Sequence, residues 1–558
     1  MQDAKITLLQ PPKIQEMNKK ILSVLCFTFL FNIVNAQLTG SLTKKVDTIF
    51  AKYDKPNSPG CALAILKDGK ILYQKGYGMS NLEYGIAISP SSVFHVCSVS
   101  KQFTAAAIIM LSLEGKLSLN EDIRKYIPEV PDFGHIITFN HLLHHTSGLR
   151  DQWDLKALAG WRDGDLISEK DIMEMLARQK ALNFIPGDEF NYCNTGYTLL
   201  AVAVKRVTGV SLREYTDSVF FKPLGMTSTH FHNDHAEITP NRTSAYRKDE
   251  KGIWKISIPV FDTYGPTSLF TTVEDLAKWD ENFYTKQIGG SNFVNAMQLT
   301  GSLNDGTPQT YASGLFIQTY NGYKTVEHSG ADAGYRSYFL RFPDQHFSVI
   351  LLANFANINT GLLSTKVADI FLKNKSVKEQ IATTKIDSTI VKGWVGDYLD
   401  MNTKESVKFS CKNGKLLVDD MMLKPSNNLL FTDPNSNATY SFSGDSLNAK
   451  FILSAKGLKN RTFGKVKKTT LTTAQLQEYK GEFYSPELDT KYEISTNENE
   501  LLVKIPRNDE MKFSPFISDM FSGNFTITFS RNKANIITGF FITTGRVRNL
   551  YFAKQIAK

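Results

Sequence analysis

The sequence predicts an α+β region followed by an all-β region. Two observations indicate this division. β-rich runs lie near residues 60–77 and 314–353 with helical patterns between them, and only short strand-like runs with Asn, Gly and Asp turns follow residue 372. A sheet built from both ends of the first region, with a helical body inserted, fits this order better than alternating βαβ units. The 558 residues also exceed one usual domain of about 100–200 residues.

The first 36 residues are expected to be a signal peptide. Ile21 to Val34 form an apolar run that follows two lysines, and Val34-Asn35-Ala36 offers small outer residues for cleavage. The polar residues before Met17 do not fit a signal, so Met17 is the better translation start. The run is too short to span a bilayer comfortably, although a retained anchor is the alternative. We therefore expect an exported protein, periplasmic or secreted, with no stable membrane span after cleavage.

Four cysteines remain in residues 37–558, namely Cys61, Cys97, Cys193 and Cys411. An even number in an exported chain permits disulfides, but four are too few for a disulfide scaffold of this size. Because Cys97 and Cys193 lie inside the motifs described below, where a small buried residue would serve, we expect free thiols.

The elements of residues 37–372 follow from local patterns. Residues 60–77 are two β-rich runs joined by the Asp-Gly of a hairpin turn. Residues 103–113 are apolar on nearly all sides and end near Gly115, which predicts a buried helix. The other predictions are helices at 169–179, 195–208, 273–284 and 362–372, and strands at 314–320, 335–341 and 347–353.

The C-terminal region begins after a predicted linker at 373–392, which is polar and lacks apolar periodicity. Residues 393–558 repeat internally. GWVGDY at 393–398 resembles YKGEFY at 479–484, and LLV follows both after the same interval. We expect two halves of about four strands each to close one eight-stranded barrel, which could hold a small ligand or fill itself with side chains. Two unrelated β-segments are the alternative.

The net charge of +9 does not indicate a nucleic-acid partner. Residues 373–558 hold 28 Lys and Arg against 19 Asp and Glu, so the whole excess lies there, scattered rather than clustered. The chain has no CxxC, HExxH or P-loop motif, and we expect no cofactor. His230, His232 and His235 have a spacing that could bind a metal, but they follow a Pro-Leu-Gly-Met turn in an expected loop, and we predict no metal.

A candidate nucleophile opens the predicted buried helix as Ser98-Val99-Ser100-Lys101. Residues three apart on a helix share a face, so the Ser98 hydroxyl and the Lys101 amine should be neighbours. A serine alone is a poor nucleophile, but a lysine whose ammonium is disfavoured by burial can take its proton. SxxK is a common tetrapeptide, and a helix-capping serine beside a solvated lysine is the alternative.

Two further motifs support this interpretation. Tyr192-Cys193-Asn194 precedes a helical run, which places an amide and a phenol able to relay a proton at one loop tip. His328-Ser329-Gly330 comes just before the strand at 335–341, at an edge where a small residue lets a substrate backbone approach. The ordered set SxxK, YxN and HxG rarely arises by chance.

Together these motifs resemble the serine β-lactamase and penicillin-binding superfamily, in the class C-like branch that includes D-alanyl-D-alanine peptidases, D-amino-acid peptidases and carboxylesterases. The resemblance runs from Leu42 to Leu372 and includes LLHHTSGL at 142–149, PLGM at 223–226 and SLFTT at 268–272. It implies a β-lactamase-like fold for residues 37–372, with an antiparallel sheet flanked by helices and an all-helical lobe. His144 and His145 would belong to a structural Thr-Ser-Gly turn.

The resemblance also implies a role for each motif residue. Ser98 would be the acyl-forming nucleophile and Lys101 its base. Tyr192 would be the proton shuttle and Asn194 a positioning amide. The backbone N–H groups of Ser98 and Ala331 would form the oxyanion hole.

His328 departs from the lactamase pattern, because it stands where those enzymes carry the lysine of KTG. The resemblance implies a catalytic place for His328 and substrate contacts for Ser329 and Gly330. The departure favours a peptidase or esterase over an efficient antibiotic-destroying enzyme. Asp332 and Arg336 could line the cleft and read a substrate carboxylate, or simply form a surface salt bridge.

The C-terminal barrel resembles lipocalin-like modules of some peptidases in this superfamily, which implies a lid over the cleft or an assembly surface, and leaves a homo-oligomer open. We therefore expect an exported serine hydrolase that acts through an acyl-Ser98 intermediate on small amides or short peptides containing a D-amino acid. A carboxylesterase or weak β-lactamase is the second interpretation. A catalytically silent ligand-binding or penicillin-sensing protein is the third.

Overall fold

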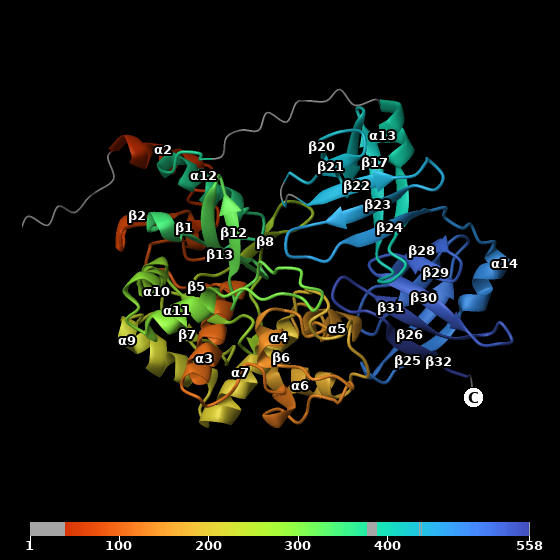
Figure 1. Ribbon diagram of the computed structural model, residues 1–558, viewed down its shortest axis with the longest axis horizontal. Coiled ribbons are helices and arrows are strands. Elements are labelled where there is room, and N and C mark those ends of the chain that lie inside the picture. The colour runs from red at the N-terminus through yellow and green to blue at the C-terminus, as the bar shows by residue number, and fades with distance from the viewer. Residues whose placement is uncertain (1–39, 376–387, 435, 437, 557–558) are drawn as a thin grey trace, which may run out of the picture.

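The computed structural model describes residues 40–375, 388–434, 436 and 438–556 (Figure 1). The predicted signal peptide and the predicted start at Met17 lie outside the described residues, as does most of the predicted linker. Among the described residues, no helix is long and apolar enough to cross a membrane.

A six-stranded antiparallel sheet joins the two ends of the first region, as predicted. The strand order is β12-β13-β14-β15-β1-β2. The strands are β1 Cys61–Lys67, β2 Lys70–Tyr77, β12 Phe316–Tyr320, β13 Tyr323–Asp332, β14 Tyr335–Phe342 and β15 Phe347–Ala353. The central strands β1 and β15 are buried on both faces because helices cover both sides of the sheet.

The side chains of β1 alternate between two cores. Its even-numbered residues face the helical lobe, and its odd-numbered residues face α2 (Gly40–Phe50) and α12 (Thr360–Phe371). On the lobe side, α10 (Val273–Thr285) packs on β1 and β15. The fold class predicted for this region is therefore correct.

Helix α3 (Lys101–Leu113) is the centre of the helical lobe. Its first eleven residues are buried, and it packs against α7 (Asn194–Thr208) and α11 (Gly290–Gln298). A 3₁₀ turn, η1 (Cys97–Ser100), leads directly into it. The other helices of the lobe are α4 Phe139–Leu143, α5 Gln152–Leu158, α6 Glu169–Ala177, α8 Leu212–Thr216, the π-helical turn η3 Asp217–Phe221 and α9 Lys222–Leu224. The short strands are β3 Met79–Asn81, β4 Ile86–Ala87, β5 Phe94–His95, β6 Ile167–Ser168, β7 His230–Phe231, β8 Tyr246–Lys248, β9 Trp254–Ile256, β10 Phe261–Asp262 and β11 Leu269–Thr271.

The C-terminal region contains a closed eight-stranded barrel, as predicted, but the second half alone forms it and the first half forms a sheet of its own (Figure 1). The prediction that the two halves close one barrel together is therefore wrong. The first half, which follows α13 (Ser388–Trp394), is a nine-stranded sheet, and the second half is a closed eight-stranded barrel. Because the strands are only two to seven residues long, each half has enough residues to form a complete sheet. Each half also buries its own cluster of aromatic residues.

The strands of the first half are β16 Gly396–Leu399, β17 Ser406–Lys412, β18 Lys415–Val418, β19 Met421–Met422, β20 Lys424–Pro425, β21 Leu430–Thr432, β22 Thr439–Ser443, β23 Lys450–Ser454 and β24 Arg461–Val466. Helix α14 (Thr473–Leu476) precedes the closed barrel. The strands of the barrel are β25 Gly481–Ser485, β26 Thr490–Thr496, β27 Leu501–Lys504, β28 Met511–Ile517, β29 Met520–Ser522, β30 Thr526–Arg531, β31 Ile537–Thr543 and β32 Leu550–Lys554.

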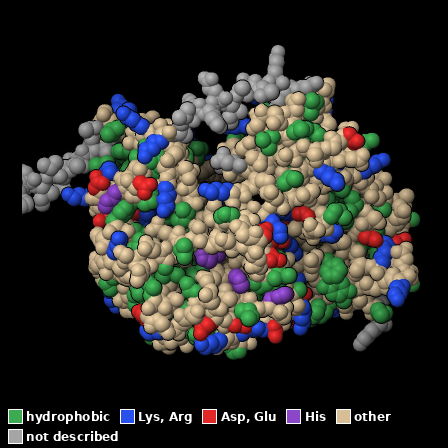
Figure 2. All heavy atoms as spheres, in the orientation of Figure 1, with side chains coloured by type: hydrophobic (Ala, Val, Ile, Leu, Met, Phe, Trp, Pro, Cys, Tyr) green, Lys and Arg blue, Asp and Glu red, His purple; other side chains and the backbone are tan. Residues whose placement is uncertain are grey.

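The sequence repeat has a structural counterpart in these two halves. In each, the first strand pairs with the last, β16 with β24 and β25 with β32. In each, a lysine of the last strand covers a glycine of the first. Lys465 lies over Gly396 and Lys554 over Gly481, and the two glycines have φ values of +141° and +143°. In the orientation of Figure 2, Lys and Arg side chains are scattered among Asp and Glu over this region.

The closed barrel is fixed to the helical lobe through a shared core and a buried ion pair. Leu155 and Leu158 of α5 belong to the same apolar cluster as the barrel interior. The hydroxyl of Tyr492 donates a hydrogen bond to the Leu158 carbonyl at 2.7 Å. Arg150 and Glu487 form an ion pair at 2.6 Å, and both side chains are buried. The barrel therefore packs against α5 and the residues just before it.

We predict that Glu487→Gln lowers the melting temperature and destabilises the folded protein by about 3–5 kcal/mol, because the buried Arg150 guanidinium loses its counter-charge. Thermal unfolding followed by circular dichroism tests this. The matched control is Glu482→Gln, since Glu482 is 63% exposed and lies 3.9 Å from Lys491 on the same barrel. Equal melting temperatures for the two variants would contradict the prediction.

Candidate active site

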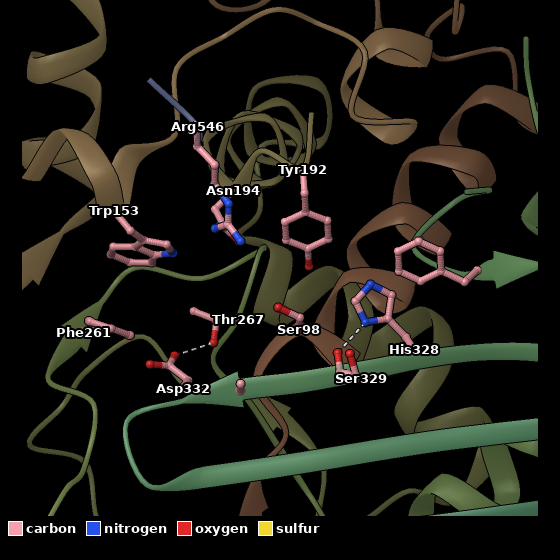
Figure 3. Close-up of a pocket in the computed structure, with 12 residues that line it drawn as sticks. Ser98, Trp153, Tyr192, Asn194, Phe261, Thr267, His328, Ser329, Asp332 and Arg546 are labelled. Atoms are coloured by element: carbon pink, nitrogen blue, oxygen red, sulfur yellow. Dashed lines mark hydrogen bonds between the residues drawn. The ribbon is translucent and has the colours of Figure 1, made fainter. Parts of the chain in front are cut away.

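A cavity of about 510 Å³ lies where the helical lobe, β13 and the closed barrel meet (Figure 3). It gathers most of the predicted site residues, although their motifs are far apart in the sequence. The residues that line it are Ser98, Trp153, Tyr192, Asn194, Phe261, Thr267, Phe316, His328, Ser329, Ala331, Asp332 and Arg546. Lys101 lies fully buried beneath Ser98.

Ser98 is presented by a strained backbone. The preceding Cys97 has a φ of 52°, in the left-handed region that costs a residue with a side chain about 1–2 kcal/mol. The Ser100 hydroxyl stabilises this turn by donating to the Cys97 carbonyl at 2.5 Å and accepting from the Leu269 N–H at 3.0 Å. Ser98 is half-buried, so its hydroxyl borders both the cavity and the interior.

The Lys101 amine is held by three oxygen atoms. Its Nζ lies 3.1 Å from Ser98 Oγ, 2.9 Å from Asn194 Oδ1 and 2.8 Å from the Pro266 carbonyl. Burial lowers the pKa of Lys101 to about 7; the Asp151 carboxylate opposes this shift and the Arg546 guanidinium adds to it. A substantial fraction of the amine is therefore neutral at pH 7 and able to accept a proton.

Asp151 holds Asn194 in place. One of its carboxylate oxygens accepts the Asn194 backbone N–H at 2.6 Å and the Asn194 side-chain amide at 2.8 Å. The amide oxygen of Asn194 is thereby turned toward Lys101. Asp151 was not among the predicted site residues. An aspartate at the start of a helix is a sequence signal that could have drawn attention to it. Asp151 caps the N-terminus of α5, and its side chain accepts a hydrogen bond from the Trp153 N–H.

Tyr192 packs against His145 and points its hydroxyl toward Ser98 (Figure 3). The two rings are 4.2 Å apart, and His145 Nδ1 accepts the Cys193 backbone N–H at 3.1 Å. His145 therefore supports the loop that carries Tyr192. The sequence had predicted only a place in a structural turn for this histidine. Burial raises the pKa of Tyr192, while Ser98 and the Arg546 guanidinium act in the opposite direction.

His328 is buried and carries no charge. Burial, and to a smaller degree the Lys101 ammonium, lowers its pKa to about 3. Its Nδ1 donates to the Ser329 carbonyl at 2.6 Å, since a carbonyl can only accept, and its Nε2 then accepts from the Tyr311 hydroxyl at 3.0 Å. His328, which stands where the lactamases carry a lysine, thus supplies no cation. Its neighbour Tyr311 was not among the predicted site residues.

The free edge of β13 forms the floor of the cavity. Residues 328–332 pair with β14 only, whereas residues 323–327 pair with β12 on the other side of the strand. The side chains of Ser329 and Ala331 are exposed at the cavity. Gly330 is buried and packs against η1 instead, because a Cβ there would lie 2.6 Å from the Val96 carbonyl oxygen and 2.3 Å from Ser337 Oγ. Its missing side chain lets β13 approach the serine turn.

Asp332, the last residue of β13, and Arg336 of β14 make different contacts. Asp332 lines the cavity and accepts a hydrogen bond from Thr267 at 3.0 Å, and burial raises its pKa to about 6. Arg336 donates to the carbonyls of Ala333 and Tyr335 and forms no side of this cavity. Among the described residues, Arg336 therefore forms hydrogen bonds to backbone carbonyls rather than the salt bridge considered as an alternative.

The clustered histidines lie apart from this cavity. His230, His232 and Glu237 offer ligand atoms within 4.8 Å of one another, and His235 lies in a separate group with two aspartates. The Glu237 carboxylate already accepts two hydrogen bonds from Arg213, at 2.5 and 2.7 Å. None of these residues lines the cavity around Ser98.

The four cysteines among the described residues are free thiols, and Cys61, Cys97 and Cys193 are buried. Burial raises the pKa of the Cys97 thiol well above its usual range and that of Cys193 to about 12. Both therefore act as small packing residues beside the site rather than as nucleophiles.

Residues 46–366 match the family model described as Beta-lactamase. Protein flp of Staphylococcus aureus (strain MRSA252) is 29% identical over 328 residues, 57% of this chain and 64% of flp. The D-aminopeptidase of Gluconobacter oxydans (strain 621H) is 27% identical over 298 residues, 53% of this chain and 56% of that protein. The chain thus spans less than two thirds of either relative. The octameric penicillin-binding protein homologue from Pyrococcus abyssi shares the fold, with a TM-score of 0.54 and 23% identity over 76% of this chain and 99% of that one.

We predict that Gly330→Ala destabilises the protein by about 1–3 kcal/mol and slows modification of Ser98, because the added methyl group forces β13 away from η1. Melting temperature and the rate of Ser98 labelling by a fluorophosphonate measure both effects. Gly196→Ala in α7 is the control, since its Cβ would find its nearest neighbours at an ordinary 3.5 Å. A Gly330→Ala protein that melts and reacts like the control would refute the prediction.

Proposed function

Because the chain belongs to the beta-lactamase family, we propose that it is a serine hydrolase that acts through an acyl-Ser98 intermediate on small amides or short peptides containing a D-amino acid. The strongest support is the contact of 3.1 Å between Ser98 Oγ and the buried Lys101 amine. A base this close, with its pKa lowered to about 7, is what a serine nucleophile requires.

In the proposed acylation step, neutral Lys101 takes the Ser98 proton as Oγ attacks the substrate carbonyl. Asn194 and the Pro266 carbonyl hold the amine at the serine, so little reorganisation is needed when the proton moves. The negative charge that develops on the carbonyl oxygen would be stabilised by the backbone N–H groups of Ser98 and Ala331.

Collapse of the tetrahedral intermediate breaks the bond to the leaving group, which needs a proton if it is an amine. Tyr192 is proposed to relay that proton from the Lys101 ammonium, since its ring lies 4.8 Å from Lys101 Nζ and its hydroxyl faces Ser98 (Figure 3). Water then hydrolyses the acyl ester and restores Ser98. No cofactor takes part in this proposal.

The substrate class is proposed from the relative named D-aminopeptidase and from the size of the cavity, which suits a short peptide. A carboxylesterase or weak β-lactamase is the second candidate, because the neutral His328 leaves the β13 side of the cavity without a cation. Export through residues 1–36 remains a prediction, which sequencing the N-terminus of the exported protein would test. A homo-oligomer is likewise a prediction, and sedimentation would test it.

We predict that a penicillin or a fluorophosphonate forms a covalent adduct with the protein and that Ser98→Ala abolishes both the adduct and the hydrolysis of D-alanine p-nitroanilide. Intact mass and absorbance measure the two effects. A Ser98→Ala protein with undiminished turnover would end the proposal. A stable adduct without any turnover would favour the silent penicillin-sensing alternative.

We predict that kcat/KM rises with pH along an acid limb near pH 7, because Lys101 must lose its proton to act as a base. Asp151→Asn removes a negative charge that favours the ammonium, so the pKa of Lys101 falls and the limb moves to lower pH. Lys101→Arg cannot act as a base and should lose about 10²–10⁴-fold in rate. A limb that stays in place in Asp151→Asn would contradict this assignment.

A further inference from the structure

The closed barrel contributes one residue to the cavity wall. Arg546 belongs to the loop between β31 and β32, and its side chain enters from above Asn194 and Tyr192, on the side opposite β13 (Figure 3). Nothing in the sequence near Arg546 indicates a site residue. It becomes part of the cavity only because the barrel docks on α5.

The loop that carries Arg546 is fixed by hydrogen bonds to the lobe. The Arg546 carbonyl accepts from the Asp151 N–H at 3.2 Å and from the Asn183 amide at 2.9 Å. On the preceding side, the Gly545 carbonyl accepts from the Asn191 side chain at 2.9 Å. The Thr544 hydroxyl donates to Asp154 at 2.6 Å. The backbone is thus held on the lobe while the side chain projects into the cavity.

Among the described residues, the guanidinium of Arg546 forms no hydrogen bond to another side chain, although it lies over the Tyr192 ring, 5.4 Å from the ring centre. Within the described part of the chain, its closest carboxylate is Asp151, with 4.0 Å between Arg546 Nη1 and Asp151 Oδ2, and that oxygen already accepts two hydrogen bonds from Asn194. The Arg546 side chain is 42% exposed. By contrast, Arg548, two residues further along, is nearly buried and pairs with Glu189 at 3.0 Å.

The charged residues that line the cavity are Asp332, whose carboxylate accepts a hydrogen bond from Thr267, and Arg546, which is the permanent cation that faces a substrate. Among the residues that line the cavity, the other nitrogen base is His328, which is neutral, and Lys101 lies beneath the surface with its hydrogen bonds taken. Trp153 and Phe261, stacked at 4.8 Å, form an apolar wall beside it. A guanidinium with free N–H groups binds a carboxylate through two parallel hydrogen bonds.

We propose that Arg546 is a specificity-determining residue that binds a substrate carboxylate, so that the barrel selects anionic substrates for the Ser98 site. This inference rests on the proposed function for its substrate class. The carboxylate could be the C-terminal group of a short peptide or the side chain of an acidic residue, and both present the same chemistry to the guanidinium.

The test compares substrates that differ only in charge, using the full chain with Ser98 titrated by a fluorophosphonate. One pair is acetyl-D-Ala-D-Ala and its C-terminal amide, and the other is D-Glu and D-Gln p-nitroanilide. We expect Arg546→Gln to lower kcat/KM about 10- to 100-fold for the carboxylate member of at least one pair, mainly through KM. The neutral member should change less than about threefold. The pair that responds identifies the source of the carboxylate.

A second variant of Arg546 separates charge from geometry, and a distant arginine provides a matched control. Arg546→Lys retains the charge without the planar fork and should restore part of the lost affinity. Arg206→Gln is the matched control, because Arg206 is 45% exposed, pairs with Glu129 on the surface and lies at the far end of α7. It should leave both members of each pair unchanged.

An equal loss for charged and neutral substrates in Arg546→Gln would overturn the proposal, since Arg546 would then act through Lys101 and Tyr192 rather than on the substrate. No loss at all would overturn it too. Calorimetric binding of each carboxylate and its neutral partner to Ser98→Ala separates this inference from the proposed reaction. A carboxylate preference that Arg546→Gln removes supports the inference even if turnover fails, and an absence of preference refutes it.

Discussion

The structure around the site depends on a lysine amine kept away from water. Lys101 begins α3 and is fully buried, yet its Nζ reaches oxygen atoms from three other segments, namely Ser98 of η1, Asn194 of α7 and the carbonyl of Pro266. These contacts satisfy the polar group that burial would otherwise leave unpaired. They also fix the two helices and the 266 loop relative to one another, so packing and the proposed chemistry depend on the same atom.

A second layer supports this arrangement. Asp151 caps α5 and holds Asn194, while His145 packs under Tyr192 and accepts the Cys193 N–H. Gly330 allows β13 to lie against η1, which brings the strand edge to Ser98. Each of these residues acts through another one, and together they define the cavity without lying at the centre of it. Geometry of this kind is what an active site requires from its surroundings.

Much of the first region could be predicted from the sequence because its information is local. The hairpin at 60–77, the apolar helix predicted at 103–113 and the three motifs each depend on neighbouring residues, and the resemblance supplied the fold that unites them. Asp151, Trp153 and Arg546 were missed because their importance arises from contacts between segments far apart in the chain. The strand count of the C-terminal region was wrong because strands of only two to seven residues merge into fewer runs when read by pattern.

Ser98 and Arg546 line the same cavity but are separated by 448 positions in the chain. The ribosome therefore synthesises the two parts of the pocket at different times. A ribosome adding about 5–20 residues per second makes Ser98 and Lys101 long before the β31–β32 loop exists. A chain that stops before this loop carries Ser98 and Lys101 but lacks Arg546, so this part of the cavity wall depends on full-length synthesis and on docking of the barrel.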